Sequence, residues 1–261
     1  MKICKDVILL TSHVISKSIF SQYQALKIAV SEQTDLFLLL EDIGVKIQFP
    51  ADIQAYTFSE DTIEELKYTS IEETLIPGSN HFPVLQFYRD FPDYETYWNI
   101  EYDVYFHGDW RVFFYAFENI KADFISSHIE YFRQRPYWYW WNTLHLKTLS
   151  IPQSAHIKSF NPIYRISNKA LSYLHKVLCA QNYGHHEALI PTVLNNAGFS
   201  LLDYGGIGNF TPQEFKNRFY NSVSTLDDYY SNTTMRFRPP YDREKIENTP
   251  CDNQLYHPVK F

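Results

Sequence analysis

Two acidic residues, Glu101 and Asp103, stand two positions apart in an otherwise apolar and aromatic run, Tyr97–Gly108. Residues two apart on a strand point to the same face of a sheet, so the pattern predicts two neighbouring carboxylates at the end of a strand. Mg²⁺ and Mn²⁺ take oxygen ligands from one or two carboxylates in such a position. By residue type and spacing alone, an acid pair on an exposed strand edge, bonded to Arg or Lys, is the more frequent case.

A second polar group comprises His185, His186 and Glu187, at a predicted junction between a loop and a helix. The start of a helix favours anions, and a carboxylate there can act as a general base if it lies beside a cleft. The alternative is a helix-capping acid followed by histidines that bond to the backbone. The spacing differs from HExxH, which argues against a zinc-protease site.

Positively charged groups that could meet a phosphate are Arg165 and, near the end of the chain, Lys260. The neighbouring His257 precedes a proline, which favours an extended backbone. Each of these residues taken alone is a weak signal, since a histidine near a chain end is usually a surface residue.

Two further segments could bind a sugar. Asn80 and His81, within PGSNHFP, could hold a diphosphate or sugar hydroxyls, or could be ordinary turn residues. The aromatic block Tyr137–Trp141 could stack against an acceptor sugar or could belong to the core.

The elements that must position these residues begin with a β-α-β pattern. Short apolar runs predict strands at Lys5–Ser12 and Asp35–Leu40, and helical spacing of apolar residues predicts a helix at Ser16–Ser31. This order predicts a parallel sheet with a right-handed crossover.

The second half of the chain predicts further elements around the histidine-rich group. Ser159–Ile166 is predicted to be a bent or edge strand because it contains a proline. Helices are predicted at Ser167–Gln181, with Ser167 as the cap, and at Glu187–Asn196. The sequence after Thr211 is loop-like, and no linker divides the chain, so one domain is the simplest interpretation.

Composition excludes some classes of protein. Of the 261 residues 18% are aromatic, which predicts stacking surfaces or, equally, a core rich in Phe and Tyr. The net charge of −7 argues against a nucleic-acid-binding protein, which would carry a basic stripe.

Cysteine usage and the N-terminus bear on location. The three cysteines, Cys4, Cys179 and Cys251, are far apart, so neither a disulfide framework nor a zinc-thiolate site is indicated. The apolar run Val7–Leu10 is too short for a signal sequence or a membrane span. We therefore expect a soluble cytoplasmic protein, with contact to the membrane surface left open.

Taken together, four segments resemble a mostly bacterial family of glycosyltransferases: PGSNHFPVLQFYRDFPDYETYWNIEYDVYFHGDW, SFNPIYRIS, GHHEALIPTVLNNAGF and LYHPVK. The resemblance runs from about the second predicted strand to the last residues. It implies a GT-A-like α/β fold, with a Rossmann-type mixed, mainly parallel sheet flanked by helices. Residues 1–261 would form a single domain, with a nucleotide-binding half at about 1–110 and an acceptor-binding half at about 111–261.

The resemblance also implies roles for the acidic strand and the chain end. Asp103 would bind a divalent metal, Mn²⁺ or Mg²⁺, as the last acid of a DxD-type motif. Glu101 stands at the first position of that motif, where this chain has Glu instead of Asp, so it would reach the metal, a metal-bound water or the ribose. His257 matches the C-terminal histidine that binds the metal in many such enzymes.

Glu187 matches the acid that deprotonates the acceptor hydroxyl in inverting members of this superfamily. Thr11 and Ser12 would lie beside the nucleotide base. Lys260 and Arg165 would face the diphosphate, and a segment at Asn232–Asn253 would close over the donor. The acceptor or sugar would be bound by a larger set of residues: Asn80, His81, Trp140, Trp141 and His186.

The implied function is transfer of a sugar from a UDP- or GDP-sugar to a glycan or glycolipid acceptor, in the synthesis of a bacterial surface polysaccharide. No nucleic acid is expected as a partner. Contact with the inner face of the membrane is compatible with a glycolipid acceptor. Two alternatives stay open at this point: a metal-dependent hydrolase that uses the same carboxylates, and a non-catalytic sugar-binding protein with a degenerate site.

Overall fold

The structure is a computed structural model that describes residues 5–42, 44, 49–222, 230 and 232–260. Its centre is a seven-stranded sheet in the order β3-β2-β1-β4-β7-β6-β8. The strands of this sheet are β1 (Asp6–Ser12), β2 (Thr34–Glu41), β3 (Ala55–Phe58), β4 (Thr96–Glu101), β6 (Phe124–Tyr131), β7 (Ile157–Ser167) and β8 (Leu201–Asp203). Within it, β7 runs antiparallel to β4 and β6, whereas the other neighbouring pairs are parallel. The predicted mixed, mainly parallel sheet is confirmed.

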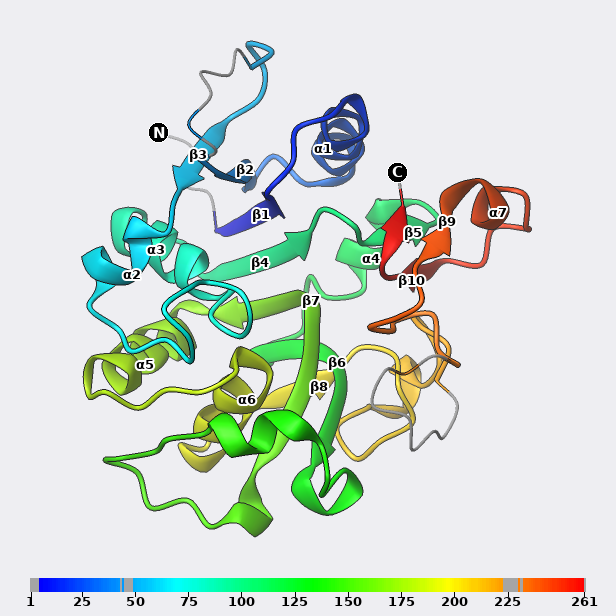
Figure 1. Cartoon of the computed structure of the whole chain (residues 1–261). Helices are drawn as coiled ribbons and strands as arrows, with labels where there is room; N and C mark the ends of the chain where they lie inside the picture. The colour runs from blue at the N-terminus through cyan, green and yellow to red at the C-terminus, as the bar shows by residue number, and fades with distance from the viewer. Residues whose placement is uncertain (1–4, 43, 45–48, 223–229, 231, 261) are drawn as a thin grey trace.

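Helices cover both faces of the sheet, as Figure 1 shows. The helices of the described chain are α1 (Lys17–Ala29), α2 (Asp61–Leu66), α3 (Phe82–Asp90), α4 (Trp110–Tyr115), α5 (Asn168–Cys179), α6 (His186–Asn196) and α7 (Arg243–Glu247). Short 3₁₀ turns lie at η1 (Phe132–Gln134), η2 (Tyr139–Thr143), η3 (Gln153–Ala155) and η4 (Gln213–Phe215).

Side chains of β1 point alternately to the two faces of the sheet and pack into a separate hydrophobic core on each face. Val7 and Leu9 pack into the core shared with α3, α5 and α6, whereas Ile8 and Leu10 pack into the core shared with α1 and α4. Because side chains of a strand point alternately to the two faces, a run of consecutive apolar residues marks a strand buried on both sides. The predicted β-α-β opening is confirmed.

Ser167 caps α5 as predicted, since its hydroxyl accepts a hydrogen bond from the Ala170 backbone N–H at 3.3 Å. The next helix begins at His186, one residue before the predicted start, with His185 as its cap. Both helices pack against one face of the sheet and fix the start of α6 beside β7.

The strand predicted at Ser159–Ile166, as a bent or an edge strand, is present, but an edge position is wrong. The observed β7 is longer, runs between β4 and β6, and is almost entirely buried. Pro162 is tolerated there because pairing with β4 extends only to Ile163 and the register with β6 shifts beside it. The missing N–H of proline therefore breaks no ladder hydrogen bond.

The predicted continuous acidic strand is also wrong in part. β4 ends at Glu101, Asp103 lies in a turn, and β5 (Tyr105–His107) follows. β5 pairs antiparallel with β10 (Gln254–Tyr256), near the end of the chain.

The sequence after Thr211, predicted to be loop-like, contains short regular elements. β9 (Tyr241–Asp242) leads into α7 and pairs in parallel with β11 (Val259–Lys260). Figure 1 shows β9, β10, β11 and α7 together beside β5. His257 lies between β10 and β11, so the pairing of these two strands with β5 and β9 brings it to the carboxyl end of β4, although it is far from β4 in sequence.

Candidate active site

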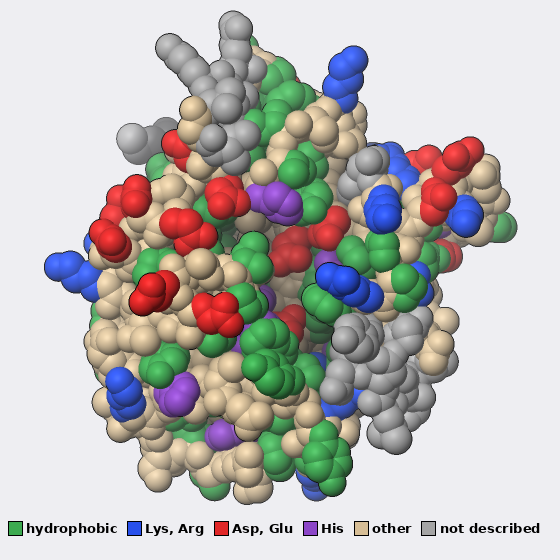
Figure 2. All heavy atoms as spheres, in the orientation of Figure 1, with side chains coloured by type: hydrophobic (Ala, Val, Ile, Leu, Met, Phe, Trp, Pro, Cys, Tyr) green, Lys and Arg blue, Asp and Glu red, His purple; other side chains and the backbone are tan. Residues whose placement is uncertain are grey.

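Two adjoining cavities open at the carboxyl ends of β1 and β4, about 950 Å³ and 250 Å³ in volume. Ligands of open α/β sheets bind at this edge. Four residues line both cavities: Ile76, Asn80, Glu101 and Asp103. Figure 2 shows the opening as a hollow in this face, with acidic and histidine side chains in its depth and hydrophobic side chains at its margin.

Glu101, Asp103 and His257 converge in the main cavity. The His257 Nε2 atom lies 3.7 Å from Glu101 Oε2 and 3.5 Å from Asp103 Oδ1. One ligand atom from each residue lies within 4.8 Å of those of the other two, which is compatible with a shared metal ion. The backbone N–H of Val259 donates to the Asp103 carbonyl at 2.9 Å, so the chain end is fixed to the acidic turn.

The orientation of His257 suits a metal ligand. Its Nδ1 lies 2.8 Å from the Arg236 carbonyl, which can only accept, so Nδ1 carries the proton and Nε2 faces the two carboxylates. Metal-binding histidines are usually held in this way.

Burial and mutual proximity of the three residues shift the pKa values of Glu101 and His257 in ways that a bound cation would compensate. Burial, together with the neighbouring Asp103, raises the pKa of Glu101 to about 8. The pKa of His257 is raised because the charges of Asp103 and Glu101 outweigh the opposing effect of burial. Asp103 Oδ1 is buried without a hydrogen-bond partner. Two carboxylate oxygens and one imidazole nitrogen form a donor set that fits Mn²⁺ or Mg²⁺.

Glu187, in the first turn of α6, lines the same cavity. The backbone N–H of Asn161 donates to Glu187 Oε1 at 3.2 Å, and His185 Nδ1 accepts from the Glu187 backbone N–H at 3.3 Å. Burial raises the pKa of Glu187 to about 7, although Lys158, Asn161 and His257 all oppose this rise. A carboxyl group that titrates near neutrality is suited to take a proton from a hydroxyl.

The histidines around Glu187 are neutral. Burial lowers the pKa of His186 to about 3, and burial together with His186 holds the pKa of His185 well below its usual range. Both line the main cavity. His81, predicted to bind sugar, does not line either cavity: it is 2% exposed and its ring stacks on His186 at 6.0 Å. Asn80, from the same segment, lines both cavities.

Aromatic rings form one wall of the main cavity. Trp138, Tyr139 and Trp140 line it, and the Trp140 ring stacks on His185 with centroids 4.3 Å apart. Trp141, also predicted to bind sugar, does not line it: it is 5% exposed and its Nε1–H donates to the Arg135 carbonyl at 2.7 Å. Trp141 therefore fixes the backbone that presents the other three rings.

Arg165 does not lie in the site, contrary to the sequence-based prediction. Its guanidinium donates to the carbonyls of Phe117, Ile120 and Ala122, and the distance to the Phe117 oxygen is 3.0 Å. Because β7 is antiparallel to β4, Arg165 pairs with Trp98 early in β4, far from the strand end that carries Glu101. Arg165 ties the loop after α4 to the sheet.

The other predicted donor-binding residues lie at the two cavities. Thr11 and Ser12, at the end of β1, line the smaller cavity, and Thr11 Oγ1 donates to Asn99 Oδ1 at 2.6 Å. Lys260 lines the main cavity. From the segment predicted to close over the donor, Phe237 and Arg238 line this cavity too.

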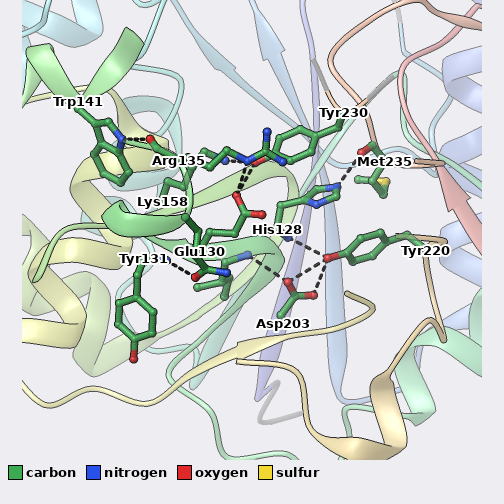
Figure 3. A network of polar contacts seen from close by, with 12 residues as sticks. His128, Glu130, Tyr131, Arg135, Trp141, Lys158, Asp203, Tyr220, Tyr230 and Met235 are labelled. Carbon is green, nitrogen blue, oxygen red and sulfur yellow. Dashed lines mark hydrogen bonds and ion pairs between the residues drawn. The ribbon is translucent and has the colours of Figure 1, made fainter. Parts of the chain in front are cut away.

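The sequence analysis did not single out two polar residues that line the main cavity, Lys158 and Tyr230. Lys158 stood directly before SFNPIYRIS, in a strand whose other residues are nearly all apolar or small, and a lysine in such a run is a signal that could have been followed. Tyr230 comes from a segment with no readable pattern. Figure 3 shows Lys158 and Tyr230 together beside the partly buried ion pair of Arg135 and Glu130.

Comparisons with known proteins give distant likenesses. No protein-family model matches the chain, and no curated sequence is similar to it. A glucose-1-phosphate thymidylyltransferase from Bacillus anthracis, in complex with a sucrose, shares 14% identity over 76% of this chain and 85% of that one, with a TM-score of 0.43. The galactosyltransferase LgtC, in complex with donor and acceptor sugar analogues, shares 11% identity over 97% of this chain and 87% of that one, with a TM-score of 0.43.

An active-site mutant of LgtC shares 10% identity over 97% of this chain and 87% of that one, with a TM-score of 0.44. These neighbours are a nucleotidyltransferase and glycosyltransferases. Because the TM-scores lie below 0.5, we draw no conclusion about substrate or mechanism from them. Within the described residues, the helices are all too short or too polar to span a membrane.

Proposed function

We propose that this protein is a metal-dependent glycosyltransferase that moves a sugar from a nucleotide-diphosphate sugar, with UDP or GDP as the nucleotide, to a glycan or glycolipid acceptor. The observation that carries the proposal is that one cavity contains both a cluster of three residues with the geometry to hold a metal ion and a separate carboxyl group whose pKa is raised to about 7. In an inverting transfer of this kind the metal would neutralise the leaving diphosphate, and a separate base would activate the acceptor hydroxyl.

The donor would occupy the edge of the sheet. The nucleoside would lie in the smaller cavity against Thr11 and Ser12, and the diphosphate would lie between the metal site and Lys260. Asp103, Glu101 and His257 would hold Mn²⁺ or Mg²⁺, which neutralises the leaving diphosphate when bound. Lys260 would add charge stabilisation as the bond to the sugar breaks.

The acceptor would lie on the other side of the main cavity. Its ring would stack on Trp140 and Tyr139, and its hydroxyl would donate to Glu187, with the neutral His186 as a further hydrogen-bonding group. Glu187 takes the hydroxyl proton as the acceptor oxygen bonds to the anomeric carbon and the bond to the diphosphate breaks. A single displacement of this kind inverts the anomeric centre.

The halves of the chain contribute unequally to this arrangement. The first half, about 1–110, supplies Thr11 and the two acids, and the second half, about 111–261, supplies Glu187 and the aromatic wall. His257 belongs to the second half by sequence but serves the donor side. The family resemblance further predicts synthesis of a bacterial surface polysaccharide, a cytoplasmic location and contact with the inner face of the membrane.

Among the described residues one cluster has the geometry of a metal site, and it has no second metal site beside it. This favours transfer over two-metal hydrolysis. A panel of UDP, GDP and their sugars in a thermal-shift assay, with and without Mn²⁺, tests the proposal. We expect one nucleotide to stabilise the fold only with the metal; absence of any shift across the panel would leave a degenerate, non-catalytic site as the better description.

A further inference from the structure

The cavity contains a fully buried lysine. Lys158, the second residue of β7, is 1% exposed and lines the cavity together with Glu187. Its ammonium lies 4.7 Å from the ring centroid of Trp138 and 4.7 Å from that of Tyr230, and it donates a hydrogen bond to the Tyr230 hydroxyl. The faces of two aromatic rings stabilise a cation that has left water.

The Tyr230 ring is itself held from several sides, as Figure 3 shows. Its hydroxyl donates to Glu130 Oε2 at 3.1 Å, its ring stacks on His128 with centroids 4.0 Å apart, and the Arg135 guanidinium lies 4.6 Å from its centroid. The Lys158 ammonium is therefore surrounded by groups of the protein that also contact one another.

The same stretch of β7 also fixes Glu187. The Asn161 backbone N–H donates to the carboxylate, and the Ser159 hydroxyl donates to the Glu187 carbonyl at 3.5 Å. One strand segment, Lys158–Asn161, thus supplies two hydrogen-bond donors to Glu187 and a cation to the cavity that Glu187 lines.

Resting on the proposed function, we propose that Lys158 is a positioning residue for the base: its fixed ammonium holds the Glu187 carboxylate in the ionised form that can accept the acceptor proton. As a positioning residue, Lys158 touches neither donor nor acceptor. It acts through Glu187.

The other groups that face Glu187 do not replace this charge. His185 and His186, on its own helix, are neutral, and Glu101, from β4, repels the ionised form. The Tyr230 hydroxyl, from the segment before β9, is uncharged because burial raises its pKa. His257, from the chain end, supports the ionised form but serves the metal site. Lys158 is the cation in this set that is not a predicted metal ligand.

The test compares Lys158→Met with Lys158→Arg, which keeps the charge, and with Lys121→Met, a change at an exposed position on the surface. Transfer is measured against pH at saturating Mn²⁺ and donor. We expect the acid limb of kcat to move to higher pH by about one unit or more in Lys158→Met, the usual effect of losing a close opposite charge. Lys158→Arg and Lys121→Met should keep the acid limb of the wild type.

An unchanged acid limb in a folded Lys158→Met protein overturns the inference, as does a limb that shifts equally in Lys158→Arg. If the methionine variant does not fold, Lys158→Gln carries the same expectation. The side-chain carboxyl ¹³C resonance of Glu187, identified by its loss in Glu187→Gln, gives the same answer without turnover. Full transfer by Glu187→Gln would instead refute the proposed function, so the two failures are distinguishable.

Discussion

The two ends of the main cavity stabilise a buried carboxylate in different ways. At the metal end, Glu101 and Asp103 face each other and one histidine, and the pKa of Glu101 is raised to about 8 by burial and by Asp103. At the base end, burial raises the pKa of Glu187 only to about 7, because the positive charge of Lys158 opposes the rise. The first end has the geometry to hold an added metal ion, whereas the second has a lysine of the protein in the same cavity.

Because of this difference, we expect substitutions at the two ends to impair different properties of the protein. The metal end depends on a ligand that can be removed, so its defects should appear as lost binding of the nucleotide. The base end depends on a proton, so its defects should appear in turnover and its pH dependence, with binding left intact.

The largest effect is expected at the metal end. Asp103→Asn removes a charged ligand, so nucleotide-dependent thermal stabilisation and transfer should both disappear, as they should when a chelator removes the metal. Asp93→Asn, at an exposed position, is the matched control and should behave as the wild type. Intact nucleotide binding by Asp103→Asn would show that the metal assignment is wrong.

At the base end, Glu187→Gln should lower kcat by about 10²–10⁴-fold, the usual contribution of a general base. The thermal shift given by Mn²⁺ and the donor should stay as in the wild type, because Glu187 is not a metal ligand here. Loss of both binding and turnover would mean that the two ends are not functionally separate.

The metal-free protein should respond to pH at the metal end. The pKa values of Glu101 and His257 are both raised in the fold, so the folded state binds more protons than the unfolded one and the free energy of unfolding falls as pH rises towards about 8. Added Mn²⁺ must displace these protons and should stabilise the fold more at pH 8 than at pH 6. Denaturant titrations at both pH values, with and without Mn²⁺, measure the effect; a metal-induced gain that is equal at both would contradict it.

The smallest effect is expected on the aromatic wall. Tyr139 is 68% exposed and lines the cavity, so Tyr139→Ala should raise the KM for the acceptor about tenfold, which corresponds to about 1.4 kcal/mol, and leave the KM for the donor unchanged. Tyr115→Ala, at a 78% exposed ring that does not line either cavity, is the control. If both changes affected the KM for the acceptor equally, the aromatic wall would not be part of the acceptor site.

Local patterns predicted the parts of the fold that short-range physics governs. The apolar runs of β1 and β2, the helical spacing of α1 and the cap at Ser167 were all readable, because each depends on residues within a few positions. The acidic strand was misjudged because a turn after Glu101 cannot be distinguished from a continuing strand by alternation alone.

The contrast between Lys158 and Arg165, both on β7, explains why the site was only partly predictable. The sequence shows two basic residues close together in one strand region, but it does not show whether this strand runs parallel or antiparallel to β4. Since β7 runs against β4, the beginning of β7 lies at the carboxyl end of β4, and Lys158 enters the cavity while Arg165 lies at the opposite edge. Similarly, His81 and Trp141 are the right residue types in the right segments but point into the core.

By itself the sequence determined the kinds of chemistry available: two acids in an apolar strand region, a third at a helix start, and a histidine near the chain end. Only the tertiary structure decided that these four meet in one cavity, because β10 and β11 return the chain end to β4 and an antiparallel β7 carries a lysine to Glu187. Strand order and direction are set by contacts between residues far apart in the chain, and such contacts leave no mark on local spacing.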